Sequence, residues 1–333
     1  HTLHYTDTQG DAYELSSEAS FEEARAKYLS SEVWAVLQPM RCVVLKAAED
    51  PVSLILIPPV REGGRPTSWK QGKLLGRGAF GTVYMAMNGD GELIAVKRID
   101  LGAAGEEVAD SFRLESSILR GLEHPNVVRF IAAKTVSKAL ALIWMEYVPG
   151  GSVANILQAF GAMSEDVVRS FSRQILLGLA YLHGKGVIHR DIKPGNILVT
   201  VDGVVKLSDF GASLNVSASV TKHRESAQRD APPPPQRNTA GVAGTPNYIA
   251  PEVLRAEGGF KVDVWSLGMT VLEMLTAERP FGHLDNVVAV LFHIGRIKEA
   301  FALPEQLSAC AKAFLGRCLR TNPEERRDAR ELI

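Results

Sequence analysis

The sequence predicts an α+β protein in which strands and helices are segregated along the chain. From Trp69 to about residue 148, short runs of β-branched and aromatic residues alternate with glycine-containing turns. Beyond Gly150 and Gly151 the apolar residues recur at helical spacing instead. A run of strands followed by a run of helices is typical of α+β folds.

Composition limits the classes of function. The 333 residues suit one large or two ordinary domains, and 46% hydrophobic with 23% charged residues is usual for a globular protein. A net charge of −1 favours neither nucleic acid nor an anionic membrane as partner. No apolar run approaches the roughly 20 residues that span a bilayer. We therefore expect no nucleic-acid partner and no membrane span.

The cysteines and the chain ends bear on location and completeness. Cys42, Cys310 and Cys318 show neither zinc-type spacing nor a disulfide framework, which fits a reducing, cytoplasmic setting. The chain starts at His1 and stops inside the helix-like ERRDARELI. We expect a fragment of a longer protein.

Residues 1–68 are predicted to be an N-terminal extension whose role the sequence does not reveal. Residues 19–37 could be helical, while 41–46 and 52–57 look like short strands. EGGRPTS, residues 62–68, is typical of a linker. The extension could be the end of an upstream domain or a brace on the surface.

The next part of the chain is predicted to be mainly β. Residues 73–87 read as strand, glycine turn and strand, and 92–99 as a third strand. A helix is expected over 106–122, followed by strands over 129–136 and 139–148.

The clearest helix is predicted from Ser164, a candidate N-cap, to His183. Its apolar residues follow the spacing of one buried face. They are Val168, Phe171, Ile175, Leu179 and Leu182.

A glycine motif lies in the first predicted hairpin. Gly76, Gly78 and Gly81 follow the pattern G-x-G-x-x-G, which lets a backbone approach phosphates closely. The same pattern also occurs in tight β-turns and, where the third glycine opens a helix, in dinucleotide sites. Here TVYMAM follows, so a flap between two strands is favoured.

Lys97 ends the apolar strand LIAVK, and Glu115 lies beside the apolar face of the predicted helix 106–122. Glu115 could reach Lys97 and form an ion pair. The alternatives are a solvated strand end and a surface glutamate.

The stretch HRDIKPGNILV concentrates polar chemistry. Asp191 can orient a hydroxyl or accept its proton, Lys193 can neutralise a phosphoryl group, and Asn196 offers an oxygen to a hard cation. Asp209, after another short strand, could bind Mg²⁺. Each acid alone could be a turn residue, but the ordered set is harder to explain that way.

This ordered set resembles the eukaryotic protein kinases. It comprises the glycine motif with Val83, A95-V96-K97, H189-R190-D191-I-K193-x-x-N196, D209-F210-G211 and A250-P251-E252, followed by D263-V-W-S-x-G268 and Arg326. The resemblance covers residues 69–333 and implies a bilobal fold. A mainly β N-lobe is expected over about 69–147 and a mainly α C-lobe over about 148–333, truncated at its C-terminus, with ATP in the cleft between them.

The resemblance also implies residue roles. Lys97, paired with Glu115, would hold phosphates; Asp191 and Lys193 would act at the transferred group; Asn196 and Asp209 would bind Mg²⁺. Met145 would be the gatekeeper, and Glu146 to Val148 the hinge. The implied ATP contacts are Leu75, Gly76, Arg77, Gly78, Ala79, Phe80, Gly81, Thr82, Val83, Ala95, Lys97, Met145, Glu146 and Val148. The implied structural pairs and stacks are Leu119 with His189 and Phe210, and Glu252 with Arg326.

Lys193 together with GTPNYIAPE, residues 244–252, resembles Ser/Thr kinases, with Thr245 near Asp191. Residues 150–157 and 160–199 resemble the MEKK/NPK-like MAP kinase kinase kinases of the STE group, which implies a MAP kinase kinase as the protein substrate. Another STE-type kinase is the alternative. The intact catalytic and metal-binding acids argue against a pseudokinase scaffold. The segment GTPNYIAPE argues against a small-molecule kinase.

The loop 212–249 is expected to be regulatory. Arg190 suggests a partner phosphate in this loop, and Thr239 is the predicted main phosphorylation site. Pro232–Pro235 must be exposed, as a tether or as an SH3-type docking site. The secondary phosphorylation candidates are Ser217, Ser219, Thr221 and Ser226.

Two positions bear on substrate preference. Kinases that select arginine often carry acids where this chain has Ser152 and Gly195. We therefore expect no strong requirement for arginine upstream of the target hydroxyl.

Overall fold

The computed structural model of the chain falls into two compact units, residues 1–56 and 57–333. The residues it describes are 3–6, 12–15, 69–78, 81–101, 105–215, 244–255, 257–284, 286–297 and 301–333. In the first unit, β1 (Leu3–Thr6) pairs antiparallel with β2 (Ala12–Leu15). The strands, helix and linker predicted between residues 19 and 68 lie outside the described residues.

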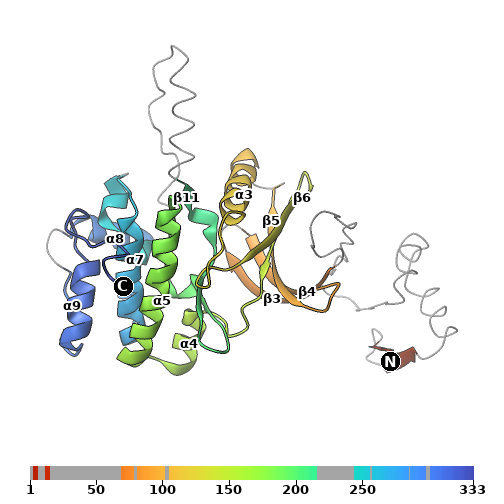
Figure 1. Ribbon diagram of the computed structural model, residues 1–333, viewed down its shortest axis with the longest axis horizontal. Helices are drawn as coiled ribbons and strands as arrows, with labels where there is room; N and C mark the ends of the chain where they lie inside the picture. The colour runs from red at the N-terminus through yellow and green to blue at the C-terminus, as the bar shows by residue number, and fades with distance from the viewer. Residues whose placement is uncertain are drawn as a thin grey trace, which may run out of the picture. The chain divides into compact units, whose positions relative to one another are not determined.

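The second unit begins with an antiparallel five-stranded sheet of order β3-β4-β5-β7-β6 (Figure 1). The sequence predicted all five strands, and their alternating β-branched and aromatic residues explain why. The strands are β3 (Trp69–Gly78), β4 (Gly81–Asn88), β5 (Leu93–Asp100), β6 (Phe130–Ser137) and β7 (Leu140–Glu146).

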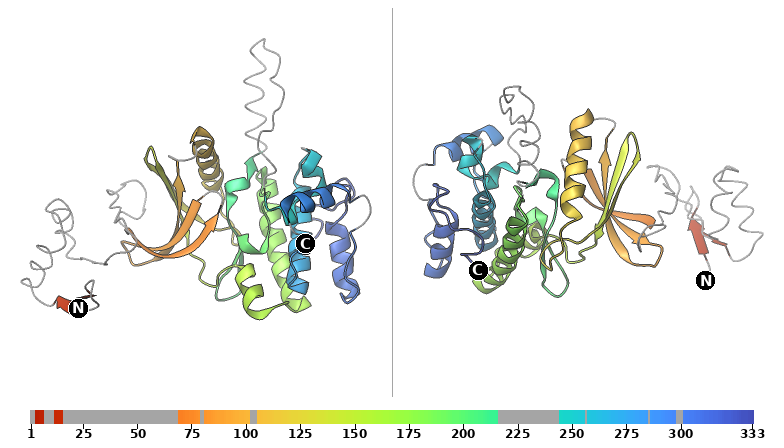
Figure 2. Two further views of the ribbon diagram at one scale, coloured as in Figure 1. Left: turned by 180° about the vertical axis from the view of Figure 1, so that it is seen from behind. Right: turned by 45° about the horizontal axis from the view of Figure 1, so that its top comes forward.

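Helix α3 (Gly105–Leu119) accompanies this sheet (Figure 2) and ends three residues before the predicted limit. Its buried residues Phe112 and Ile118 belong to the same core cluster as Ile99 and Ile143 of the sheet. A separate cluster includes Val96, Leu142 and Trp144. Because side chains alternate along a strand, Leu142 and Ile143 enter different clusters.

The rest of the unit is mainly helical, as predicted, and α5 packs against α7 (Figure 1). Helix α7 is apolar around most of its circumference, and its Trp265, Leu267 and Met269 are fully buried. It therefore forms the centre of this lobe. The helices are α4 (Val153–Phe160), α5 (Glu165–Gly184), α7 (Lys261–Thr276), α8 (Val287–Gly295) and α9 (Ala309–Cys318).

Helix α5 confirms its predicted limits within one residue. Val168, Ile175, Leu179 and Leu182 are buried on one face, and Phe171 is partly buried. Ser164 occupies the N-cap position, but its side chain makes no capping hydrogen bond. Glu165 and Asp166 in the first turn still complement the positive end of the helix dipole.

Two small antiparallel ribbons place the polar loops at the junction of the lobes. β8 (Val187–Ile188) pairs with β11 (Leu214–Asn215), and β9 (Ile197–Val199) pairs with β10 (Val205–Leu207). The backbone N–H of Val128, just before β6, donates to the Leu207 carbonyl at 2.9 Å. The segments 189–196 and 208–213 are thereby held beside the sheet. Short 3₁₀ turns also occur at Pro194–Asn196, Phe210–Ala212, Pro246–Tyr248 and Pro251–Arg255.

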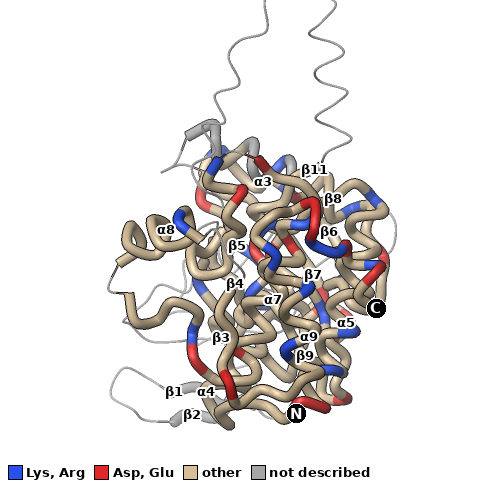
Figure 3. The backbone as a smooth tube through the Cα atoms, turned by 90° about the vertical axis from the view of Figure 1, so that its left-hand side faces the viewer, with Lys and Arg blue, Asp and Glu red and all other residues tan. Residues whose placement is uncertain are grey.

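Charge is distributed along the chain without segregation by sign. Figure 3 shows lysine and arginine interspersed with aspartate and glutamate over both lobes, as the net charge of −1 suggests. Within the described ranges, none of the helices has the length and apolar character that crossing a bilayer demands.

Candidate active site

The glycine motif forms a flap between β3 and β4, as the sequence predicted. Gly76 pairs with Val83, Arg77 with Thr82, and Gly78 with Gly81. Gly81 has φ +143°, and a Cβ there would lie 2.3 Å from the Arg98 carbonyl oxygen. Only glycine fits this approach of β4 to β5. Ala79 and Phe80, at the tip, lie outside the described residues.

Lys97 on β5 forms the predicted ion pair with Glu115 on α3. Its Nζ lies 2.7 Å from Glu115 Oε1 and 2.8 Å from Asp209 Oδ1. Burial lowers the pKa of Lys97, but the two carboxylates outweigh burial and raise it above its usual value. Burial would raise the pKa of Asp209, yet Lys97 holds it below its usual value. The ammonium therefore joins the sheet, α3 and the Asp209 loop as a charged group.

Asp191 is held by four hydrogen bonds. Its Oδ1 accepts from the backbone N–H and the hydroxyl of Thr245, each at 2.9 Å. Its Oδ2 accepts from Lys193 Nζ at 2.8 Å and from Asn196 Nδ2 at 2.7 Å. Lys193 Nζ also donates to Thr245 Oγ1. The predicted proximity of these side chains is present, and the four donors fix the orientation of the Asp191 carboxylate.

Asn196 and Asp209 were predicted to bind a metal ion, and their geometry fits that role. The Asn196 amide donates to the Asp191 carbonyl and carboxylate, so its oxygen Oδ1 is left as an acceptor. Asp209 stands at φ 60° with its side chain about one third exposed. The described residues hold no cluster of three or more His, Cys, Asp and Glu suited to a metal. An ion held by this pair would complete its coordination with phosphate oxygens and water, as Mg²⁺ usually does.

The His189 and Phe210 rings were predicted to stack, but they meet in a tilted contact instead, with centroids 4.9 Å apart and planes inclined by 52°. His189 Nε2 lies 3.1 Å from the Ser208 carbonyl oxygen. Leu119 of α3 is buried in the same core cluster as Phe210. The apolar connection predicted between the lobes is therefore built from residues of one core.

The predicted hinge, Glu146 to Val148, begins at the last residue of β7. Ala95 is buried and Met145 partly buried. The carboxylate oxygen Glu146 Oε1 accepts from Lys206 Nζ at 2.8 Å and from the Arg129 N–H at 2.7 Å. Among the described residues the backbone N–H of Val148 has no hydrogen-bond partner. It is available to a ligand in the position where adenine was predicted.

Asp263 is the main site residue whose role the sequence analysis did not assign. It is fully buried on α7. Its carboxylate accepts hydrogen bonds from the backbone N–H of His189 at 2.9 Å and of Arg190 at 2.7 Å. His183 Nε2 lies 2.8 Å from the same carboxylate. Burial would raise the pKa of Asp263, but these hydrogen bonds and the neighbouring histidines hold it below its usual value. The motif DVWSLG was noticed, yet nothing local to it indicates this distant contact.

The predicted pair of Glu252 and Arg326 is present. The Arg326 guanidinium contacts both Glu252 oxygens, donates to the Arg320 carbonyl and lies 5.1 Å from the Trp265 ring centroid. Arg326 is 1% and Glu252 2% exposed. Since both charged groups are buried, removing either one would leave the other charge without its partner in the interior, which would destabilise the fold.

The predictions for the loop fall outside the described residues. These are the phosphorylation sites Thr239, Ser217, Ser219, Thr221 and Ser226, and Pro232–Pro235. They remain predictions from the sequence. The Arg190 side chain has no ion pair with an acidic residue in the part of the chain that the structure describes.

Comparisons with known proteins identify the family of the part of the chain that carries this site. The protein kinase domain family matches residues 69–333. Mitogen-activated protein kinase kinase kinase ANP1 of Arabidopsis thaliana is 42% identical over 80% of this chain and 39% of its own length. Mitogen-activated protein kinase kinase kinase A of Dictyostelium discoideum is 37% identical over 80% and 27%, respectively. Serine/threonine-protein kinase BCK1/SLK1/SSP31 of Saccharomyces cerevisiae is 36% identical over 80% and 18%.

The chain belongs to the protein kinase family. Its bilobal α+β fold and its resemblance to MAP kinase kinase kinases are confirmed. The family implies ATP as a substrate together with a divalent metal ion. The chain corresponds to less than half the length of each of these three relatives.

Proposed function

We propose that this chain transfers the γ-phosphate of ATP to serine or threonine hydroxyls of proteins, in the cytoplasm, and that it acts as a MAP kinase kinase kinase. The convergence of Lys97, Glu115, Asp191, Asn196 and Asp209 at the junction of the lobes supports the transfer reaction. The hydrogen bond of the Thr245 hydroxyl to the Asp191 carboxylate supports serine or threonine as the acceptor. The similarity to proteins named mitogen-activated protein kinase kinase kinases supports the position in the cascade.

In the proposed mechanism, Asp191 orients the acceptor hydroxyl and takes its proton as the oxygen bonds to the γ-phosphorus. The bond from that phosphorus to the β-phosphate oxygen breaks, and ADP leaves. Lys193 Nζ donates a hydrogen bond to Asp191 Oδ2 and would neutralise charge on the transferred phosphoryl group. Lys97 would hold the α- and β-phosphates, fixed in place by Glu115.

Asn196 and Asp209 would hold Mg²⁺, which when bound neutralises charge on the phosphates. The flap from Leu75 to Val83 would cover the nucleotide. The adenine would lie against Ala95 beside Met145, and the backbone from Glu146 to Val148 would bind it.

Substrate selection is proposed to depend little on arginine. The Ser152 side chain is engaged with Asn155 as the N-cap of α4, and Gly195 carries no charge. Neither position offers an anion to a basic side chain. A strong preference for arginine on a peptide array would contradict this proposal.

The decisive experiment incubates the purified chain with Mg²⁺ and γ-labelled ATP and a panel of catalytically inactive MAP kinase kinases. We expect label on serine or threonine of their activation loops and none with Asp191→Asn or Asp209→Ala. Intact ATP binding without transfer would instead indicate a pseudokinase scaffold. Label on other proteins but on no MAP kinase kinase would retain the kinase and reject the cascade position.

A further inference from the structure

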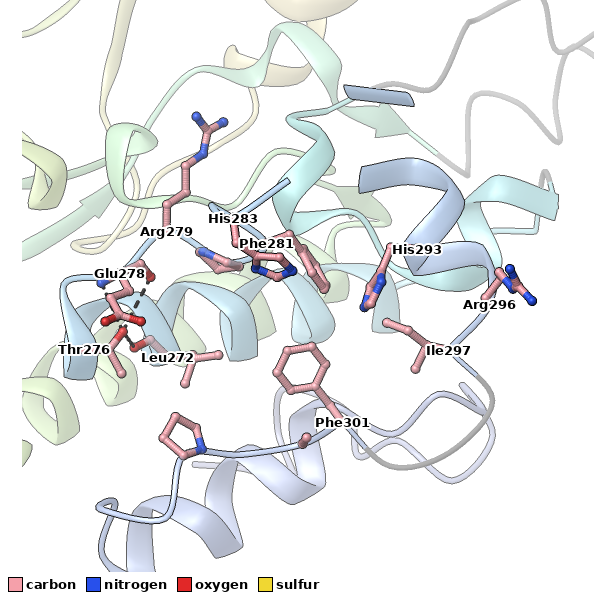
Figure 4. Close-up of a pocket in the computed structure, with 13 residues that line it drawn as sticks. Leu272, Thr276, Glu278, Arg279, Phe281, His283, His293, Arg296, Ile297 and Phe301 are labelled. Carbon is pink, nitrogen blue, oxygen red and sulfur yellow. Dashed lines mark hydrogen bonds between the residues drawn. The ribbon is translucent and has the colours of Figure 1, made fainter. Parts of the chain in front are cut away.

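A pocket of about 600 Å³ lies in the helical lobe (Figure 4). Its walls come from the last turn of α7, the loop 278–283, the C-terminal end of α8 and the segment 301–304. None of its lining residues belongs to the site proposed for phosphoryl transfer. Its volume is in the range of ligand-binding pockets.

The interior of the pocket is apolar and aromatic. Leu272 and Phe281 form a buried floor, and the Phe281 and Phe301 rings meet edge to face at 5.8 Å. The His293 ring lies 5.4 Å from Phe281. Figure 4 shows Phe281, His293, Ile297 and Phe301 converging on the middle of the pocket. Such a floor suits an apolar or aromatic side chain.

The rim carries a cation at the α8 end. Arg296 is exposed there, and the exposed His283 and His293, whose ring centroids are 6.4 Å apart, extend from the rim toward the interior. Glu278 is the one acidic residue among the described lining residues, and it lies with Arg279 at the opposite end (Figure 4). The α8 end therefore complements an anionic group next to the apolar side chain.

Apolar surface continues outside the pocket along α8. Val288 and Phe292, one turn apart, are 75% and 65% exposed. The Arg296 guanidinium lies 5.1 Å from the Phe292 ring centroid, so one side chain borders both the pocket and this exposed face. Exposed apolar side chains of this size beside a pocket are typical of protein contacts. A small metabolite would leave them uncovered.

The pocket is also connected to the segment that faces the acceptor. The Pro280 carbonyl in the pocket wall accepts a hydrogen bond from Asn247 Nδ2 at 2.6 Å. Asn247 follows Thr245 by two residues, and the Thr245 hydroxyl donates to Asp191. A protein bound at the pocket would lie beside that segment. We propose that the pocket and the exposed face of α8 dock a protein substrate through an apolar side chain flanked by acidic residues. The proposal rests on the function proposed above.

Direct binding tests it with a fluorescein-labelled peptide, Gly-Glu-Asp-Phe-Glu-Asp-Gly, measured by anisotropy on the full chain. Ala302 lines the pocket and is exposed, so it can be changed without disturbing the core. We expect Ala302→Glu to weaken binding about tenfold through like-charge repulsion, and its matched control Ala302→Lys to retain or strengthen it. Phe292→Ala should also weaken binding, whereas Arg173→Glu, on α5, should not.

Equal binding by both Ala302 variants, or equal binding of the same peptide with lysines in place of its acids, would overturn the proposal. Competition by inorganic phosphate or phenylpropionate as effective as that by the peptide would assign the pocket to a small anion instead, and would also overturn it. Binding is expected to persist in Asp191→Asn. If transfer fails in every variant while peptide binding follows this pattern, the proposed reaction is rejected and the docking surface is not.

Discussion

The carboxylate of Asp263 accepts the backbone N–H of Arg190 at 2.7 Å, and Arg190 stands at φ 69°. A side chain of the central helix thus holds the residue before Asp191 in a backbone region that non-glycine residues rarely occupy. The orientation of Asp191 depends on this contact as well as on its own hydrogen bonds.

Asp263→Ala should destabilise the C-lobe, because it leaves the buried N–H of His189 and the partly buried N–H of Arg190 without an acceptor. At about 1–3 kcal/mol for each group, we expect a loss of roughly 2–6 kcal/mol in the free energy of unfolding, measured in urea. Asp166→Ala removes an exposed carboxylate on α5 and serves as the control. A loss no larger than that of the control would show that Arg190 does not need this anchor.

Lys97→Met and Glu115→Gln should each reduce kcat/KM by about 10²–10³, because each removes part of the fixed charge that would face the phosphates. The double variant should lose little more than Lys97→Met, since the two residues act as one pair. Steady-state transfer assays measure this, with the exposed Lys70→Met on β3 as the control. Additive losses would contradict a shared role.

The buried ion pair of Arg326 and Glu252 predicts that losing one partner costs more stability than replacing both. Arg326→Met should cost about 3–5 kcal/mol of unfolding free energy, because Glu252 is left buried without its partner. Arg326→Met combined with Glu252→Leu should recover part of that loss. Arg327→Ala breaks the exposed pair with Glu331 and should cost under about 1 kcal/mol. Denaturant unfolding compares the four proteins.

Cys318 predicts an alkaline limit to stability. Burial raises the pKa of its thiol from 9.0 to about 12. The stability that depends on the protonated Cys318 thiol is fully present below pH 9 and is lost as the pH rises toward 12, because this thiol ionises at lower pH in the unfolded chain than in the folded one. The free energy of unfolding should fall up to about 1.4 kcal/mol per pH unit more steeply than in Cys318→Ala between pH 9 and 11. Parallel curves for the two proteins would refute this.

Thr239→Ala should lower the activity of the purified kinase, because a phosphate at this position would pair with Arg190. Phosphopeptide mapping and transfer assays on the same preparation give the answer. Full activity of the variant, with no phosphate mapped to Thr239 in the parent, would reject the site. The matched substitution Thr221→Ala tests whether the effect is specific.

The sequence predicted those parts of the fold that repeat locally. The strands from Trp69 to Glu146 followed from runs of β-branched and aromatic residues between turns, and helix α5 followed from the spacing of its apolar face. The end of α3 was predicted three residues late, since Leu122 continues the apolar spacing of Leu114 and Ile118 after the helix has ended at Leu119.

The site was predicted only where motifs carried it. Asp191, Asn196 and Asp209 were brought into the candidate site by their order in the motifs, whereas the contact of Lys206 with Glu146 joins residues 60 positions apart. No periodicity links such pairs, because only the packed lobes bring them together. The same holds for Asp263 with Arg190, and for the pocket beside α8.

A single ammonium group, that of Lys97, reports the relative placement of three parts of the molecule. It touches Glu115 on a helix and Asp209 on a loop while its own backbone belongs to a strand. An outward movement of that helix, or a lobe rotation that separates these groups, would exchange a contact of under 3 Å for water. Under the proposed function, such a movement would stop phosphoryl transfer while every reactive side chain stayed chemically intact.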